Sequence, residues 1–145
     1  MKLTRTLKVS EAEFYDYLEC ELLTTIYQCS AKELSANDIK KGLNYSKNED
    51  NTNARIDVTI LEYQRGSVYK ANIKSLTDNI ILSYETKVEN DGLTVVFHQY
   101  IDSFERKKHN RFMHFFSEGV YLGRMSDMIY GIQKKIITQR EAQQA

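Results

Sequence analysis

The hydrophobic residues of this chain change their spacing once, from every second residue to every third or fourth. From Leu43 to Ser103, apolar side chains alternate with polar ones, which is the pattern of strands with one buried face. Beyond this region the spacing is helical and unbroken, at Phe112, Phe115, Gly119, Leu122, Met125, Ile129, Ile132 and Ile136. A run of strands followed by one long helix predicts an α+β fold, because only that helix is long enough to cover the sheet.

Turn-forming residues divide the alternating region at intervals of about a dozen residues, as in an antiparallel meander. The strongest hairpin signal is Asn90-Asp91-Gly92, and further turns are expected at Arg65-Gly66 and at 77–79. We therefore predict strands over residues 55–63, 68–75, 80–89 and 93–102. Residues 2–9 alternate imperfectly and predict one more strand. Because the alternating region begins at Leu43, ahead of the strand at 55–63, we expect a curved antiparallel sheet of about six strands.

Two helices are expected between the first strand and the meander. Ser10 and Glu13 have the spacing of a capping box, in which each residue satisfies an amide of the first helical turn, and an apolar stripe follows them. Ser35 and Asp38 repeat this signal ahead of a shorter helix that ends near Gly42. The predicted order is therefore strand, two short helices, meander and a C-terminal helix of roughly 25 to 30 residues.

Three glycines lie inside the predicted C-terminal helix, at positions 119, 123 and 131. Each costs about 1 kcal/mol relative to alanine in a helix interior, so a compensating reason is expected. Two explanations stay open, namely a close approach of the helix backbone to the sheet and a break of the helix near Gly119. Residues 140–145 are polar, and we expect them to fray.

The size and composition predict one cytoplasmic domain over residues 1–145. There is no proline for an interdomain linker, no apolar run of signal-peptide or membrane-span length, and no pair of cysteines at redox or zinc spacing. Cys20 and Cys29 are expected to be free thiols, at least one of them in the core. The 20 cations balance the 20 anions, which removes the basic field of a nucleic-acid-binding protein, so no nucleic acid partner is expected.

The balance of charge is nevertheless uneven along the chain. Residues 1–103 contain 12 cations and 16 anions, whereas residues 104–145 contain 8 cations and 4 anions. The densest basic run precedes the C-terminal helix and consists of Arg106, Lys107, Lys108 and Arg111. Two readings stay open for this patch: it attracts a phosphate, a lipid headgroup or an acidic partner, or it is a solvated loop.

The sequence contains none of the arrangements that catalysis by a nucleophile, a metal or a bound phosphate requires. There is no G-x-S-x-G elbow and no glycine-rich loop, and the three histidines lack the spacing that would place two on one helical face. His98 is expected on the strand face opposite Phe97. We therefore predict no catalytic residue, no metal and no cofactor, and the sequence favours a role other than catalysis.

The aromatic residues of the chain include ten tyrosines and no tryptophan. Tyr69 and Tyr84 fall on the apolar faces of neighbouring predicted strands, where each phenol needs a hydrogen-bond partner or a wet cavity. Ordinary core tyrosines and a ligand pocket both fit this pattern. The second reading predicts a cavity lined by Tyr69, Ile73, Tyr84, Phe97, Gln99, Phe112, Phe116 and Met125.

The element order resembles that of START-like domains, the helix-grip superfamily that includes the birch-pollen allergen type. Within that superfamily, three stretches are similar to a bacterial family known as domain of unknown function 3284: Lys41-Gly42-Leu43-Asn44-Tyr45, Ile60-Leu61-Glu62-Tyr63 and Ile81-Leu82-Ser83-Tyr84-Glu85. The resemblance implies a cavity between sheet and C-terminal helix that holds an apolar or amphipathic small molecule or lipid.

Three functional hypotheses follow from these observations. The first is a non-enzymatic binder of such a small molecule. The second is an interaction module with a filled core that docks a protein partner or a second copy, as co-chaperone-like members of the superfamily do. The third is a cyclase- or hydrolase-type enzyme, which the missing acid–base constellation disfavours.

Overall fold

The computed structural model describes residues 1–48, 53–107 and 110–144 of the chain. Within these residues, six strands form one antiparallel sheet with the order β1-β6-β5-β4-β3-β2, which confirms the predicted fold class. The first strand therefore pairs with the last one, whereas all other neighbours are consecutive in the chain. The strands are β1 (Lys2–Leu7), β2 (Asn44–Asn48), β3 (Arg55–Gln64), β4 (Val68–Lys74), β5 (Asn79–Glu89) and β6 (Gly92–Ile101).

Helices follow the first strand and the last one. Only the second of the two helices expected after β1 is short, since the first has 20 residues. A five-residue helix between β6 and the long C-terminal helix was not predicted from the sequence. The helical segments are α1 (Glu11–Ser30), the 3-10 helix η1 (Ala36–Asp38), α2 (Asp102–Arg106) and α3 (Arg111–Gln144).

The capping box predicted at the start of α1 is confirmed. The Ser10 hydroxyl accepts the backbone amide of Glu13 at 3.1 Å, and the amide of Ser10 donates to the Glu13 carboxylate at 2.9 Å. Two amides of the first turn are thereby satisfied by side chains. The helix ends at Ser30, and the capping residue Ala31 adopts the left-handed conformation with φ 57°.

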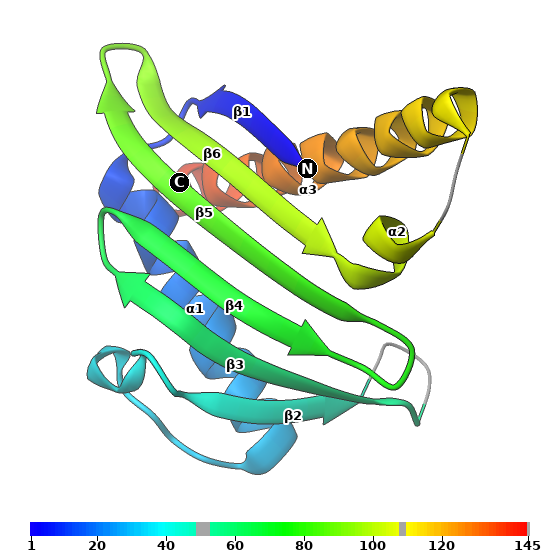
Figure 1. The fold of residues 1–145 in the computed structure, drawn as a ribbon. Helices are drawn as coiled ribbons and strands as arrows, with labels where there is room; N and C mark the ends of the chain where they lie inside the picture. The colour runs from blue at the N-terminus through cyan, green and yellow to red at the C-terminus, as the bar shows by residue number, and fades with distance from the viewer. Residues whose placement is uncertain (49–52, 108–109, 145) are drawn as a thin grey trace.

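The sheet curves, and α1 and α3 lie on the same side of it (Figure 1). We call this the helix face and the opposite side the outer face. On the helix face, α1 packs against β2 and α3 packs against β1, and the two helices also touch each other. The core occupies the space between them, where Leu7, Val95 and Phe97 are fully buried. Burial of each such side chain stabilises the fold by about 1.5–3 kcal/mol.

The turn into β6 requires glycine for a steric reason. Gly92 has φ 145°, and a Cβ atom at this position would lie 2.0 Å from the carbonyl oxygen of Leu7. The register pairs Leu7 with Leu93, so the backbone of β1 passes directly beside this turn. The hairpin predicted at 90–92 is thus confirmed, and its glycine also makes room for β1.

Both sequence-based explanations of the helical glycines are wrong. The helix α3 runs from Arg111 to Gln144 without a break at Gly119. No heavy atom lies within 4 Å of a Cβ built at Gly119, Gly123 or Gly131, so the backbone makes no close approach there. These glycines therefore face open space.

Two further expectations differ from the structure. Cys20 and Cys29 are free, but both are exposed: Cys20 borders a groove between α1 and α3, and Cys29 borders an open depression beside β2. The fraying expected from residue 140 is not observed up to Gln144, since α3 continues to that residue. Arg140 is held there by an ion pair with Glu13. Position 145 lies outside the described residues.

Candidate functional site

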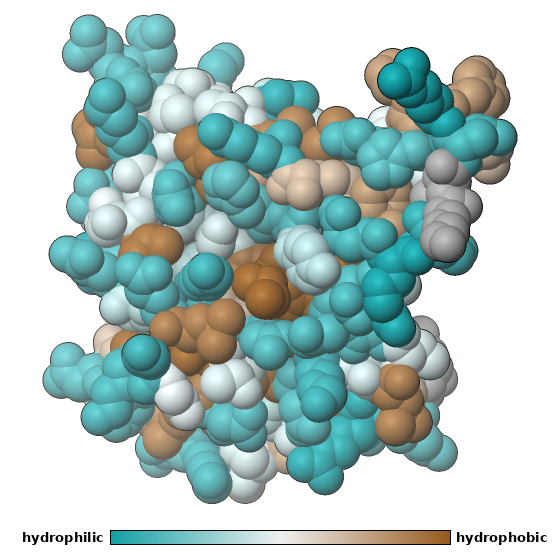
Figure 2. Space-filling model, in the orientation of Figure 1, coloured by the Kyte–Doolittle hydropathy of each residue, from teal (hydrophilic) through white to brown (hydrophobic). Residues whose placement is uncertain are grey.

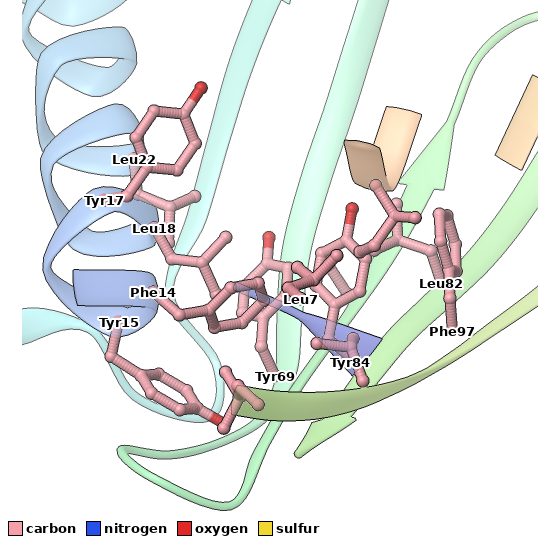
Figure 3. Packing of buried hydrophobic residues seen from close by; sticks show 14 of the residues in the cluster. Leu7, Phe14, Tyr15, Tyr17, Leu18, Leu22, Tyr69, Leu82, Tyr84 and Phe97 are labelled. Carbon is pink, nitrogen blue, oxygen red and sulfur yellow. The ribbon is translucent and has the colours of Figure 1, made fainter. Parts of the chain in front are cut away.

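Two tyrosines lie side by side at the centre of the helix face. Tyr69 of β4 and Tyr84 of β5 are direct neighbours in the strand register. Their rings stack with centroids 6.1 Å apart and an interplanar angle of 21°. Phe97 of β6 continues the row with its ring centroid 4.8 Å from that of Tyr84. Figure 3 shows the two phenol groups pointing in the same direction, away from Tyr15.

The hydroxyl groups of these tyrosines are unusual because neither forms a hydrogen bond with a described residue. The side chains are only 7% and 5% exposed, yet neither phenol oxygen belongs to the fully enclosed, unsatisfied polar atoms of the described chain. Each oxygen therefore borders a small accessible space. By contrast, Tyr15 is hydrogen-bonded to Thr86 at 2.7 Å and Tyr63 donates to Glu19 at 2.5 Å.

Burial keeps both phenols neutral. Removal from solvent raises the pKa of Tyr69, and the neighbouring Tyr45 and Tyr84 raise it further. Burial likewise raises the pKa of Tyr84, with a smaller contribution from Tyr17. Each group thus remains a neutral hydrogen-bond donor and acceptor throughout the physiological pH range.

Apart from the neighbouring Tyr17, Tyr45 and Tyr63, the surroundings of the phenols are apolar. Ile73 lies on β4 between Val58 of β3 and Ile80 of β5, and it is partly buried. Met125 closes the same cluster from α3, with no exposed surface. The structure therefore brings together five of the predicted cavity residues, which we call the tyrosine site: Tyr69, Ile73, Tyr84, Phe97 and Met125.

The other three predicted cavity residues lie elsewhere. Phe112 and Phe116 are 74% and 60% exposed on the first turns of α3, where the helix has left the sheet. Helical periodicity gave their spacing but not the point at which α3 separates from the core. Gln99 is paired with Leu82 in the register and borders an open depression that includes Met1 and His98. Its backbone amide donates to the carbonyl oxygen of Met1 at 2.9 Å.

Tyr45 belongs to this region, although the sequence analysis did not select it. It lies on β2 opposite Val58 and packs against the core cluster. Burial raises the pKa of Tyr45 to about 12. It lies two residues after Leu43, as expected for neighbours on one strand face, but only the strand register brings it near Tyr69.

The predicted basic patch is divided between two helices. Arg106 ends α2 and pairs with Asp102 at 3.0 Å, while Arg111 begins α3. Lys107 is exposed between them, and Lys108 lies outside the described residues. The structure therefore places three of the four cations along the α2–α3 connection.

The outer face of the sheet, which Figure 2 views directly, has a different character. His98 lies there, opposite in direction to Phe97, as predicted from strand alternation. An open depression of about 520 Å³ on this face is lined by Met1, Lys70, Ile81, Ser83, Glu85, His98, Gln99 and Tyr100. Over residues 1–48, 53–107 and 110–144, no three His, Cys, Asp or Glu side chains converge as metal ligands would.

No helix in the described parts of the chain has both the length and the apolar character needed to cross a membrane.

Comparisons with solved structures show the same fold in distant relatives. An uncharacterised protein from Rhizobium leguminosarum superimposes with a TM-score of 0.63 at 12% identity, over 95% of this chain and 93% of that one. The Aha1 dimer from Colwellia psychrerythraea gives 0.58 at 8% identity, over 94% of each chain. Ara h 8.0201 gives 0.55 at 11% identity, over 95% of this chain and 97% of its own. At sequence identities this low, the comparisons show a shared fold and nothing more.

A search of curated proteins finds no match. One family model matches residues 1–118, which cover the whole sheet, α1, α2 and the first turns of α3. The chain therefore belongs to the family described as domain of unknown function DUF3284, and its fold is the helix-grip fold of Bet v 1-like proteins.

Proposed function

We propose that the protein is a non-enzymatic binder of a small amphipathic molecule, held between the sheet and α3 at the tyrosine site. One observation carries the proposal: two adjacent buried phenols, Tyr69 and Tyr84, have no hydrogen-bond partner among the described residues. Each hydroxyl oxygen borders an accessible space, so a ligand in that space would form hydrogen bonds with both phenols without displacing a protein partner.

The chemistry of the site indicates the class of ligand. Both phenols are neutral, and the core residues that surround them are apolar apart from the neighbouring tyrosines. A carbonyl or hydroxyl oxygen would accept a hydrogen bond from each phenol without bringing a charge into an apolar environment. The remainder of the ligand would be apolar, because it would contact Ile73, Phe97 and Met125. A small molecule with one neutral polar end matches both requirements.

Native mass spectrometry of the full chain purified from its own host tests this proposal. We expect one small molecule as added mass on the wild-type chain, released on denaturation. The double variant Tyr69→Phe with Tyr84→Phe removes only the two hydroxyl oxygens. It should lower the occupied fraction at least about tenfold, because the ligand loses two hydrogen bonds.

A matched double variant, Tyr27→Phe with Tyr130→Phe, removes the same atoms from side chains that are 55% and 42% exposed. It should leave the added mass unchanged. Titration with Nile red, an apolar dye with a carbonyl group, gives a second readout on the same variants. Absence of added mass together with equal dye affinity in both double variants would refute the proposal.

The same spectra distinguish the small-molecule proposal from the interaction-module hypothesis. A filled core predicts no small-molecule mass and no effect of either tyrosine pair. A docked protein would instead appear as an added mass of several kilodaltons or more, which the small-molecule proposal does not produce.

A further inference from the structure

The amino-terminal part of α3 stands clear of the sheet. Figure 1 shows it projecting past β1, and Figure 2 shows apolar residues at this projecting end. On the side that faces the body of the protein, Phe104 of α2 packs against Tyr121 and His114, with ring centroids 5.2 and 5.1 Å apart. That contact fixes the orientation of the helix and leaves its opposite side directed toward solvent.

The solvent side is strongly apolar. Phe112, Phe115 and Phe116 are 74%, 79% and 60% exposed. Val120, one turn further along, is 42% exposed. Contiguous exposed apolar side chains of this size mark interaction sites in folded proteins.

Two of the unexplained glycines lie on this same side. At about 100° per residue, Phe112, Phe116, Gly119 and Gly123 project from one face of the helix. We call this the outer side of α3 and include Val120 in it. The packing of this chain does not require glycine at 119 or 123, because no heavy atom lies within 4 Å of a Cβ built there. A second backbone approaching closely would require it.

We infer that the outer side of α3 binds a second copy of this chain, with the two α3 helices antiparallel. Phe112 and Phe116 are four residues apart, and so are Gly119 and Gly123. A two-fold axis between the pairs places Phe112 over Gly123 of the second copy, and Phe116 over its Gly119. Each large ring then fits into the space above a glycine, and symmetry makes the contact self-complementary.

The exposed area is sufficient for such a contact. An aromatic side chain buries about 150–250 Å², so the three exposed phenylalanines alone contribute roughly 400 Å² per copy. A standard interface buries about 800 Å² per partner, and Met113, Val120 and the glycine backbones enlarge the contact toward that value. The contact therefore reaches the range of weak to moderate dimers.

The charges near the contact are mixed. The same two-fold axis places Arg111 opposite the exposed Arg124 of the second copy, and Asp127 lies within about one turn of both arginines, where it offsets their repulsion. A parallel pairing would place each charge beside its own equivalent. An anionic lipid surface would suit Arg111 and Lys107, but it would give no reason for the two glycines.

Light scattering coupled to size-exclusion chromatography of the full chain tests the proposal. We expect a mass of twice 17.0 kDa at high protein concentration. Gly123→Leu fills the space that the phenylalanine ring occupies, while leucine favours a helix more than glycine does. This variant should remain folded by circular dichroism, and its dimer dissociation constant should rise at least about a hundredfold because the clash occurs twice.

Gly131→Leu is the matched control, since it makes the same change in the same helix at a position that is also open. It should leave the dissociation constant unchanged. Phe112→Ser with Phe116→Ser should produce a monomer by the opposite route, through loss of the rings.

Cysteine pairing tests the direction of the helices. In a background with Cys20→Ser and Cys29→Ser, one chain carries Phe112→Cys and another carries Gly123→Cys. An antiparallel dimer should form the mixed disulfide on oxidation, whereas a parallel dimer would form the two symmetric ones.

Three results would overturn the inference. The first is a monomeric wild type at a concentration of about 100 µM, a level at which even weak specific dimers are populated. The second is an equal effect of the leucine variants at 123 and 131. The third is a monomeric wild type that floats with vesicles of equimolar phosphatidylglycerol and phosphatidylcholine, which would assign the face to a membrane surface. Because Tyr69 and Tyr84 lie in the core, the small-molecule proposal can fail without affecting any of these results.

Discussion

Arg140, near the end of α3, forms a bidentate ion pair with Glu13 in the first turn of α1. The guanidinium donates from Nε and Nη2 to the two carboxylate oxygens, each at 2.8 Å. The same Nη2 donates to the carbonyl oxygen of Lys8 at 3.1 Å, and the carboxylate also accepts the amide of Ser10. The last turns of α3 are thereby tied to the start of α1.

Arg140→Gln should lower the urea midpoint of unfolding. The substitution removes both hydrogen bonds to Glu13 and leaves the carboxylate with its Ser10 contacts only. Lys135→Gln is the control, because Lys135 is exposed on the same helix and loses the same charge. Equal midpoints for the two variants would show that the ion pair contributes nothing to the fold.

Acid should weaken the wild type through this same pair. The hydrogen bond from Arg140 is the main cause that lowers the pKa of Glu13 from 4.5 to about 2. A carboxylate with a lowered pKa in the folded state stabilises the fold above its unfolded pKa, and this contribution disappears as pH falls toward the folded value. The free energy of unfolding should therefore fall between pH 4.5 and 2, and it should fall less in Arg140→Gln. Urea titrations at several pH values measure both slopes.

Removal of two different tyrosine hydroxyls should have unequal effects on the ligand-free protein. Tyr15→Phe breaks the 2.7 Å hydrogen bond to Thr86 and should cost about 1 kcal/mol of unfolding free energy. Tyr84→Phe breaks no hydrogen bond with a described residue and should change stability by less than about 0.5 kcal/mol. Chemical denaturation of both variants, after removal of any bound molecule, gives the comparison. A larger loss for Tyr84→Phe would contradict the unpaired state of its phenol.

Gly92→Ala should strongly lower the free energy of unfolding, although it adds only one carbon atom. A Cβ would lie 2.0 Å from the carbonyl oxygen of Leu7, which forces β1 away from β6. We expect a loss of more than about 2 kcal/mol, because overpacking and backbone strain add together. Gly42→Ala separates these two causes, since Gly42 also has a positive φ but no atom within 4 Å of the Cβ. Gly42→Ala should cost about 1 kcal/mol. Thermal unfolding of both variants measures the two losses.

The elements with regular hydrophobic spacing could be predicted from the sequence, because spacing reports directly on the face that a side chain occupies. Tyr69 and Tyr84 were placed on one apolar face for this reason, and the register confirms that they are neighbours. The capping box at Ser10 was equally visible, since it depends on residues only three positions apart.

The outcome at Phe112 and Phe116 could not be predicted in the same way. Phe112 begins the apolar stripe that continues to Met125 and Ile136, yet Phe112 and the nearby Phe116 project from the side of the helix away from the core. A spacing of three or four residues drifts around the helix over several turns, so residues at its two ends need not face the same neighbour. Likewise, glycines inside a helix indicate that a larger side chain would be unfavourable there, but they do not identify the molecule that occupies the space.

The pairing of β1 with β6 also sets the order in which the protein can form. Leu7 is opposite Leu93 in the sheet, so the first strand has no partner until nearly the whole meander has been synthesised. Contacts between residues so distant in sequence are slow to form, because a long loop must close before they are made. During that interval the apolar side chains of β1 are exposed, and the nascent chain is at its most vulnerable to aggregation. In a helix-grip protein of this topology, the sheet is therefore complete only after the last strand has paired with the first.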